Sequence, residues 1–181
     1  FVYFQVTRGT GTRSHVWGEM CRGNVWVMLR PAKTKDVYKK IKLITEPDTR
    51  FLHCDIKTLN LIPSVMAAQK AELAGAHEAV LHRDGRVTEC AHSNVHIIKD
   101  GVFRTAPTDN LILPGIARAH LITACRELGI PVNETPFTVD ELMNAKEVLI
   151  SSSSAPGLRC VEIDGKPVGR QAPEGVAARQ K

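Results

Sequence analysis

The sequence predicts a mixed α/β fold, and three observations support this prediction. Residues 1–7 alternate with the two-residue period of a strand and are rich in aromatic and β-branched residues. The Asp-Gly pairs at 84–85 and 100–101 stand beside further strand-like segments and are typical of tight hairpin turns. In residues 115–129, apolar residues recur at i, i+4, i+7 and i+11, which is a helical spacing.

The start of the chain predicts two strands, at residues 1–7 and 24–29, joined by the polar, glycine-rich loop 8–15. Residues 31–35, Pro-Ala-Lys-Thr-Lys, follow as a linker, so we divide the chain into segments 1–33 and 34–181. Because a strand begins at the first residue, we expect the natural polypeptide to extend upstream of Phe1. We also expect the second segment to be incomplete at its C-terminal end.

The second segment predicts helices among short strands. We expect a strand at residues 40–44 and a helix at 59–74, with Pro63 in its first turn. Strands at 78–82 and 94–98 flank the two Asp-Gly turns, so this middle section is expected to be antiparallel. The apolar stripe expected on the 59–74 helix consists of Ile62, Val65, Met66, Gln69 and Leu73.

A second helix begins at Gly115 and ends at Gly129, directly before Ile130-Pro131. Thr138 and Glu141 have the spacing of a capping box, which predicts a short third helix. Residues 147–150 then form a strand that runs into four serines, 151–154. The expected stripe of the second helix consists of Ala117, Leu121, Ala124 and Leu128.

The composition is that of a globular protein with a buried core, since 43% of the residues are hydrophobic and 24% are charged. No apolar segment approaches the length that spans a bilayer, so we expect no membrane partner. The net charge of +5 is scattered along the chain and aromatic residues make up only 5%, so we expect no nucleic acid; an anionic small molecule explains the charge equally well.

The cysteines predict reduced thiols in a cytoplasmic protein. They are five in number, an odd count, widely separated, and include no C-x-x-C pair. His92 and His96 are four residues apart, a spacing that suits zinc on a helix but not in the strand expected here, so no metal site is expected. The cysteines are Cys21, Cys54, Cys90, Cys125 and Cys160.

Lys57, in the run Cys-Asp-Ile-Lys-Thr-Leu-Asn, is the strongest candidate for a catalytic residue. A single lysine is more often a solvated surface charge. Apolar neighbours on both sides, Ile56 and the Leu59, Leu61, Ile62 cluster, are expected to desolvate its ammonium and favour the free amine that attacks a carbonyl carbon.

Three further features complete a recognisable set. Glu89 ends a strand, where it is either an exposed edge carboxylate or the partner of a protonated ring nitrogen. The free N–H groups of Gly115 and Ile116 open a helix and suit a phosphate, although a plain helix start has the same sequence. The serines 151–154 either donate hydroxyls to that phosphate or form a simple loop. An amine nucleophile, a carboxylate and a phosphate-binding helix start are what pyridoxal phosphate requires.

The glycine-rich loop carries Arg13 and His15, which suit a carboxylate because arginine offers a forked pair of donors. Exposed loop charges without a role are equally common. Gly9 and Gly11 lack the third glycine or the Lys-Ser/Thr that a nucleotide-binding loop needs.

Taken together, these motifs resemble the fold-type-IV pyridoxal-phosphate enzymes, the class IV aminotransferases, and most closely those that act on D-amino acids. The resemblance covers essentially the whole chain. It rests on Thr-Arg-Gly at 7–9, Arg-Ser-His at 13–15, Asp-Ile-Lys-Thr-Leu-Asn at 55–60, Val-Thr-Glu at 87–89, Ser-Asn-Val at 93–95 and Ile-Leu-Pro-Gly-Ile at 112–116.

The resemblance implies transamination between a D-amino acid, such as D-alanine, and a 2-oxo acid, such as 2-oxoglutarate, through a Schiff base on Lys57. It implies that Glu89 contacts the pyridine nitrogen, that Leu113 packs on the ring, and that Arg13 and His15 bind the substrate carboxylate in the neighbouring subunit of a homodimer. Residues 1–33 would be the last strands of a small N-terminal domain with a linker, and 34–181 the large cofactor-binding domain. The implied cofactor-binding residues are Lys57, Glu89, Ser93, Asn94, Leu113, Gly115, Ile116, Ser152 and Ser153.

The sequence departs from the family pattern at Ala117, where a phosphate-contacting threonine is usual, and at Cys90, Ala91 and His92, where small polar residues are usual. Most of the small domain, with a phosphate-binding arginine and a substrate-side tyrosine, would precede Phe1. Alternatives are a branched-chain aminotransferase or an aminodeoxychorismate lyase on the same scaffold, or a cofactor-binding fragment without catalysis.

Overall fold

A computed structural model describes residues 1–16, 22–32 and 36–169 of the chain. It divides into two compact units, Phe1–Lys35 and Asp36–Lys181. Residues 33–35 of the expected linker, Cys21 and residues 170–181 lie outside the described residues. The assignment of 1–33 and 34–181 to a small and a large domain stays a prediction.

The first unit contains an antiparallel pair of strands, β1 (Val2–Thr7) and β2 (Asn24–Leu29), as the alternation of residues predicted. The register places Phe4 opposite Val27, so both side chains stand on the same face of the ribbon. This face is apolar and exposed in the unit taken by itself. Its members are Val2, Phe4, Val6, Val25, Val27 and Leu29.

The second unit is built on a nine-stranded mixed sheet with the strand order β5-β4-β3-β10-β9-β6-β7-β8, and β11 pairs with β10. This confirms the predicted mixed α/β class. The strands are β3 (Ile41–Pro47), β4 (Glu78–Arg83), β5 (Arg86–Cys90), β6 (Asn94–Lys99), β7 (Val102–Thr105), β8 (Val132–Asn133), β9 (Glu147–Ser152), β10 (Ala155–Ile163) and β11 (Lys166–Pro167).

The expected hairpins form at the two Asp-Gly turns, since β4 pairs with β5 and β6 with β7 in antiparallel fashion. Asp84 and Asp100 have φ values of 48° and 52°, and each is followed by a glycine with a φ of 78°. Two successive residues with positive φ suit the tight hairpin turn that Asp-Gly favours. The strand expected at residues 40–44 also forms, as β3, and it runs parallel to β4.

The longest strand, β10, was not predicted from the sequence. It contains Pro156 and Gly157, which disfavour a regular strand, and its pairing with β9 is irregular between Ala155 and Leu158. Beyond that point β10 lies between β9 and β3 and contributes Leu158, Cys160 and Ile163 to the main core. Burial of these side chains therefore compensates for a weak local strand signal.

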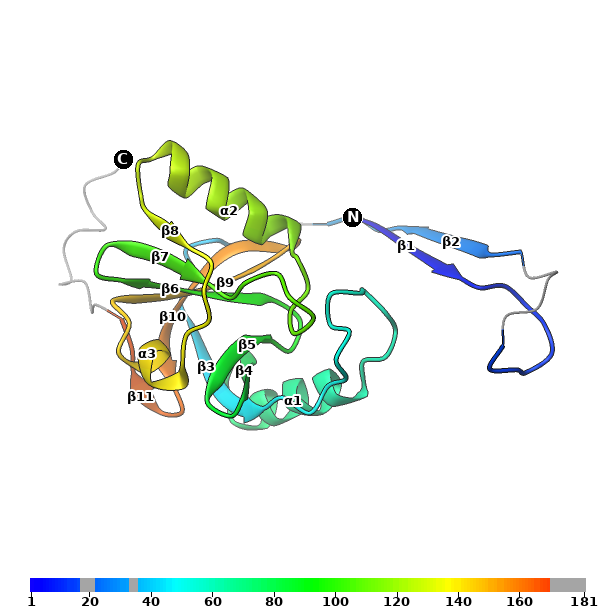
Figure 1. Cartoon of the computed structure of the whole chain (residues 1–181), viewed down its shortest axis with the longest axis horizontal. Coiled ribbons are helices and arrows are strands. Elements are labelled where there is room, and N and C mark those ends of the chain that lie inside the picture. Colours follow the sequence, from blue (N-terminus) through cyan, green and yellow to red (C-terminus); the bar gives the residue numbers. More distant parts are fainter. Residues whose placement is uncertain (17–21, 33–35, 170–181) are drawn as a thin grey trace. The chain divides into compact units, whose positions relative to one another are not determined.

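Three helices accompany the sheet: α1 (Ile62–Leu73), α2 (Ile116–Glu127) and α3 (Val139–Met143). Helix α1 packs against β3 and β4, and α2 packs against β9 and β10 (Figure 1). The predicted capping box is confirmed, with the Thr138 hydroxyl accepting from the Glu141 N–H and the Glu141 carboxylate accepting from the Thr138 N–H. None of the helices in the described ranges has the length and apolar character that crossing a bilayer requires.

The predicted apolar stripe of α1 does not face the core. The helix begins at Ile62, three residues later than expected, and buries Ser64, Ala67 and Ala71 against the sheet. Small side chains suit this face because they let the helix approach the sheet closely. The residues predicted to face inward, Ile62, Val65, Met66 and Leu73, are between 61% and 80% exposed.

The inward face of α2 is also rotated from the prediction, although the bounds of the helix are close to those expected. Ala117 is buried as predicted, but Ile122 and Arg118 are buried beside it, whereas Leu128 is 75% exposed. A charged side chain on the buried face is possible here because Arg118 donates to Thr105, Ala106 and Glu134.

Candidate active site

Four segments of the second unit surround a cavity of about 390 Å³. They are the loop between β3 and α1, the bend between β5 and β6, the segment that enters α2, and the turn between β9 and β10. All nine residues predicted to bind a cofactor line this one cavity, although they come from positions 57 to 153. They are Lys57, Glu89, Ser93, Asn94, Leu113, Gly115, Ile116, Ser152 and Ser153.

Lys57 lies on the β3–α1 loop, which is fastened to the segment preceding α2. The Cys54 N–H donates to the carbonyl oxygen of Asn110 over 3.0 Å, and the Asn110 side-chain amide donates to the carbonyl oxygen of Leu52 over 2.9 Å. These bonds join the loop to the chain that leads to the helix start, so the amine and the helix N-terminus are held in one cavity.

The expected desolvation of Lys57 by apolar neighbours is wrong for this structure. Ile56, Leu59 and Leu61 are 56%, 64% and 48% exposed, and Lys57 is itself exposed. The neighbours are adjacent in sequence, but their side chains do not pack into the core of this unit. Sequence adjacency to apolar residues therefore did not indicate burial.

Glu89, on β5, is only 6% exposed and accepts hydrogen bonds at both carboxylate oxygens. Oε1 accepts from Arg50 Nη1 at 2.5 Å, while Oε2 accepts from the Asn94 amide at 3.0 Å and from the Leu113 N–H at 3.1 Å. The Asn94 amide also donates to the carbonyl oxygen of Leu113 at 2.9 Å. The orientation of the carboxylate is thus fixed by three donors from three segments.

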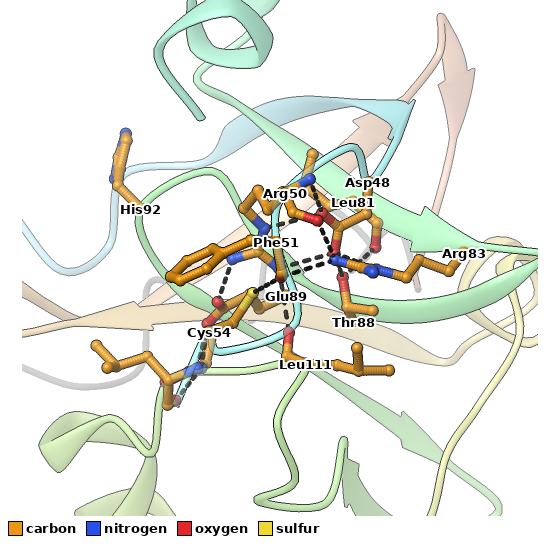
Figure 2. A network of polar contacts seen from close by, with 12 residues as sticks. Asp48, Arg50, Phe51, Cys54, Leu81, Arg83, Thr88, Glu89, His92 and Leu111 are labelled. Carbon is orange, nitrogen blue, oxygen red and sulfur yellow. Dashed lines mark hydrogen bonds and ion pairs between the residues drawn. The ribbon is translucent and has the colours of Figure 1, made fainter. Parts of the chain in front are cut away.

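Arg50 lies between two carboxylates, as Figure 2 shows. Its Nε and Nη2 donate to the two oxygens of Asp48 at 2.9 and 2.8 Å, which is a forked pair, and Nη2 also donates to the carbonyl oxygen of Leu111 at 3.1 Å. Asp48 accepts in addition from the Thr88 hydroxyl at 2.9 Å, and Arg83 Nε lies 3.2 Å from it. The buried charges therefore alternate in sign and satisfy one another.

Burial and ion pairing pull the pKa values of these groups in opposite directions. Burial raises the pKa of Glu89 to about 7, because the desolvation of its carboxylate outweighs the attraction of Arg50. Burial also opposes ionisation of Asp48, but the hydrogen bonds and charge of Arg50 outweigh it and lower the Asp48 pKa to about 2. Despite its own desolvation, Arg50 has a raised pKa because both carboxylates hold its proton. Glu89 is thus the titratable member of the group near neutral pH.

The entrance to α2 requires a glycine at position 115. A Cβ atom there would lie 2.1 Å from the Asn94 side-chain oxygen, which is closer than such atoms approach. Gly115 is the N-cap of α2, and no side chain caps the helix. The backbone N–H groups of the first turn are therefore free to bind a group inside the cavity.

The bend between β5 and β6 is organised by the buried Glu78. Its carboxylate accepts from the His92 N–H at 2.6 Å and from the Ser93 hydroxyl at 2.7 Å, and the His92 ring nitrogen Nδ1 lies 3.3 Å away. Burial raises the pKa of Glu78, while His92 and Ser93 oppose this shift. His92 lines the cavity, and Figure 2 shows its side chain directed away from the Arg50 network.

Arg13 and His15 lie in the first unit, on the loop between β1 and β2, where both are exposed. The loop is shaped in part by Arg8, whose guanidinium donates to the carbonyl oxygen of Ser14 at 2.6 Å. The role of Arg13 and His15 in binding a substrate carboxylate stays a prediction.

The polar residues that support the cavity from behind were not predicted from the sequence. Asp48 and Arg50 belong to no motif, and Thr88, although it lies in the Val-Thr-Glu motif, was given no role, so nothing in the sequence marks the three as partners. His96 was not predicted as a supporting residue either; its spacing from His92 was considered only for zinc, and no metal site was expected. The available signal was indirect: a carboxylate that is predicted to be functional and buried requires a cationic partner from elsewhere.

Comparison with known proteins shows the family of the chain. Residues 2–163 match the family described as "Amino-transferase class IV". The chain is 42% identical over 174 residues to the D-alanine aminotransferase of Bacillus licheniformis, covering 95% of this chain and 62% of that protein. The chain therefore spans less than two thirds of the length of this curated relative.

Two solved structures are also similar. A branched-chain amino acid aminotransferase of T.th., complexed with N-(5'-phosphopyridoxyl)-L-glutamate, matches with a TM-score of 0.67 and 31% identity over 71% of this chain and 46% of that chain. A fold IV-transaminase of Curtobacterium pusillum matches in fold with a TM-score of 0.80 and 23% identity over 94% of this chain and 59% of that chain. The family match extends over most of the chain, so this protein belongs to the class IV aminotransferases, as the sequence motifs predicted.

Proposed function

We propose that this chain carries the catalytic cavity of a pyridoxal-phosphate-dependent D-amino-acid aminotransferase, which exchanges an amino group between a D-amino acid, such as D-alanine, and a 2-oxo acid, such as 2-oxoglutarate. One observation carries the proposal: an amine, a buried carboxylate, a helix N-terminus and serine hydroxyls line a single cavity. Its volume of about 390 Å³ is within the usual range for small-molecule sites. The similarity to a D-alanine aminotransferase supports the choice of substrate class.

The lining residues fit pyridoxal phosphate. No side chain caps the first turn of α2, so its N–H groups can bind an anionic phosphate together with Ser152 and Ser153. Glu89 accepts from three donors, two of them at Oε2, so its Oε1 has one lone pair left to accept from a ring N–H. When bound, the cofactor supplies an electron sink for the charge released as a substrate Cα–H bond breaks.

The residues of the chain then have distinct roles. Lys57 Nζ would hold the cofactor covalently and, once displaced by the substrate amine, would carry the proton taken from Cα. Glu89 would hold the proton on the ring nitrogen, and Arg50 would favour the ionised form of Glu89 and hold its carboxylate in place. Leu113 would pack on the face of the ring.

The wider organisation belongs to the same proposal. Residues 1–33 would be the last part of a small domain and 34–181 the large domain. Arg13 and His15 would bind the substrate α-carboxylate in the cavity of a neighbouring subunit, so the working form would be a homodimer. The apolar face exposed on α1 supports a second subunit or domain in contact with it. Free thiols at the described cysteines support a cytoplasmic location.

Covalent labelling tests the proposal directly. After incubation with pyridoxal phosphate and reduction with borohydride, peptide mapping is expected to find the pyridoxyl label on Lys57. Lys57→Ala should lose this label, and Lys39→Ala, a change at an exposed lysine, should retain it. A label on another amine, or no label, would reject the assignment of Lys57.

Amino-donor profiling then separates the alternatives. Turnover of D-alanine without turnover of L-leucine supports the proposed activity, and the reverse result points to a branched-chain aminotransferase. Pyruvate release from aminodeoxychorismate would indicate a lyase. A labelled protein without any transfer activity would favour a cofactor-binding fragment without catalysis. The exposure of Lys57 supports this second candidate, because an exposed amine lacks the desolvation expected of a catalytic lysine.

A further inference from the structure

A buried histidine links the cavity, through Thr105, to Arg118 on the buried face of α2. His96, on β6, is 0% exposed, and its ring stacks on Phe103 with centroids 5.1 Å apart. Its Nδ1 lies 2.9 Å from the Thr105 hydroxyl, and its Nε2 lies 2.8 Å from the Ser151 hydroxyl. Ser151, on β9, lines the cavity, whereas Thr105, on β7, does not belong to its lining.

The direction of hydrogen bonding along this chain is set by Arg118. Its guanidinium has only donors, and Nε donates to the Thr105 oxygen at 3.2 Å. Its Nη2 donates to the Ala106 carbonyl oxygen at 2.9 Å and to the Glu134 carboxylate at 2.8 Å. The Thr105 hydroxyl therefore accepts from Arg118 and has its own proton to donate.

Within the described part of the chain, the Thr105 hydroxyl contacts only Arg118 and His96. Its proton therefore has one available acceptor, Nδ1 of His96. Burial, with a smaller contribution from the Arg118 charge, lowers the pKa of His96 to about 3, so the ring is neutral at neutral pH. A neutral ring that accepts at Nδ1 carries its proton on Nε2, and this N–H donates to Ser151.

The opposite tautomer is disfavoured by the same contacts. If Nδ1 carried the proton, the Thr105 hydroxyl proton would be buried without an acceptor. With the proton on Nε2, the one proton left over is that of the Ser151 hydroxyl, and Ser151 is one of the residues that line the cavity, where a ligand can accept this proton.

We propose that His96 is a positioning residue that directs the Ser151 hydroxyl into the cavity as a hydrogen-bond donor for the phosphate of the cofactor. This inference rests on the proposed function. The first turn of α2 offers backbone N–H groups but no side-chain cap, and Ala117 has no hydroxyl, so a directed hydroxyl from β9 supplies a donor that the helix lacks. Arg118 and Thr105 act only through His96.

The ring tautomer can be read without any ligand. In the full chain labelled with ¹⁵N-histidine, we expect the His96 spectrum at neutral pH to show an unprotonated Nδ1 and a protonated Nε2. A proton on Nδ1, or a doubly protonated ring, would overturn the inference. This measurement does not depend on cofactor binding or on activity.

Binding of two matched ligands tests the role of Ser151. Affinities are measured by equilibrium dialysis with pyridoxal phosphate and with pyridoxal, which lacks the phosphate. Ser151→Ala should lower the affinity for pyridoxal phosphate by about tenfold and leave the affinity for pyridoxal unchanged. His96→Phe should have the same effect, and the double variant should lose no more than either single one, because His96 acts through Ser151. His96→Gln, whose amide N–H can replace Nε2–H, should retain most of the affinity.

His120→Phe, a change at an exposed histidine of α2, serves as the control and should bind both ligands normally. Additive losses in the double variant, or equal losses for both ligands, would overturn the inference. Thermal melting verifies that each variant folds; if His96→Phe does not, Ser151→Ala and the ring spectrum decide. If both ligands fail to attach to Lys57 in the unmodified chain, the proposed function fails instead.

Discussion

At the scale of single residues, Arg50 and Glu89 define the chemistry of the cavity. A buried carboxylate is stabilised in its ionised form by a cation close by; Arg50 lies between the carboxylates of Glu89 and Asp48, and Arg83 is the second cation beside Asp48. Removing one member of such a group leaves the other charges buried without a partner. This lowers the stability of the folded state more than replacing the whole group by apolar residues would. This balance can be tested at Arg50 and at Glu89.

Arg50→Met is expected to destabilise the second unit by about 3–5 kcal/mol, because Asp48 and Glu89 would both lose their buried partner. Unfolding by urea, followed by circular dichroism, measures the change. Arg126→Met is a suitable control, since Arg126 is mostly exposed and forms an ion pair with the partly exposed Glu134; it should change the stability by less than about 1 kcal/mol. A loss for Arg50→Met no larger than for the control would contradict the buried network.

Glu89 makes the stability of the unliganded chain dependent on pH. Its folded pKa, about 7, is raised above the ordinary value of 4.5, so the folded state holds the proton more tightly. The stabilising contribution is complete below pH 4.5 and is lost as the pH rises to 7, at about 1.4 kcal/mol per pH unit.

Comparison of the unmodified chain with Glu89→Gln isolates this contribution, because glutamine does not titrate. The difference in unfolding free energy between the two proteins should fall between pH 4.5 and pH 7 and then level off. A difference that stays constant from pH 4 to pH 8 would show that Glu89 ionises at its ordinary pKa.

At the scale of elements, the sequence was informative where local chemistry determines structure. The Asp-Gly turns, the capping box at Thr138 and the start of α2 at Gly115 were all predicted, since each depends on residues within one or two turns of chain. The inward faces of α1 and α2 and the strand β10 were not, because tertiary contacts decide them. The same division holds in the cavity: its lining follows from short motifs, but its support from Asp48 and Arg50 depends on long-range pairing.

Gly115→Ala tests the fit between the start of α2 and β6. The added Cβ would overlap the Asn94 side chain, which also holds Glu89 and Leu113, so we expect a loss of about 1–3 kcal/mol in stability together with weaker binding of pyridoxal phosphate. Gly157→Ala is the matched control, because its nearest neighbour would lie at an ordinary 3.9 Å. Equal tolerance of both changes in a melting experiment would argue against the close contact.

At the scale of the whole molecule, the exposed apolar face of α1 bears on assembly. If the proposed homodimer uses this face, Val65→Lys combined with Met66→Lys should convert a dimer into a monomer in analytical ultracentrifugation, because lysine ammonium groups resist desolvation at an interface. Glu72→Lys, at an exposed position of the same helix, should leave the dimer intact. Unchanged association of the double variant would exclude α1 from the subunit contact.

The parallel pairing of β3 with β10 has a consequence for how the protein is made. Cys160 lies opposite Ile41, and Ile163 lies opposite Leu43, so the middle of the sheet joins segments that are more than a hundred residues apart. A chain emerging from the ribosome cannot close this pair until nearly all of the unit has been synthesised, and such high contact order slows folding. Until then, the unpaired edges of β3 and β9 are open to other chains, so chaperone demand during translation should be greatest just before β10 emerges.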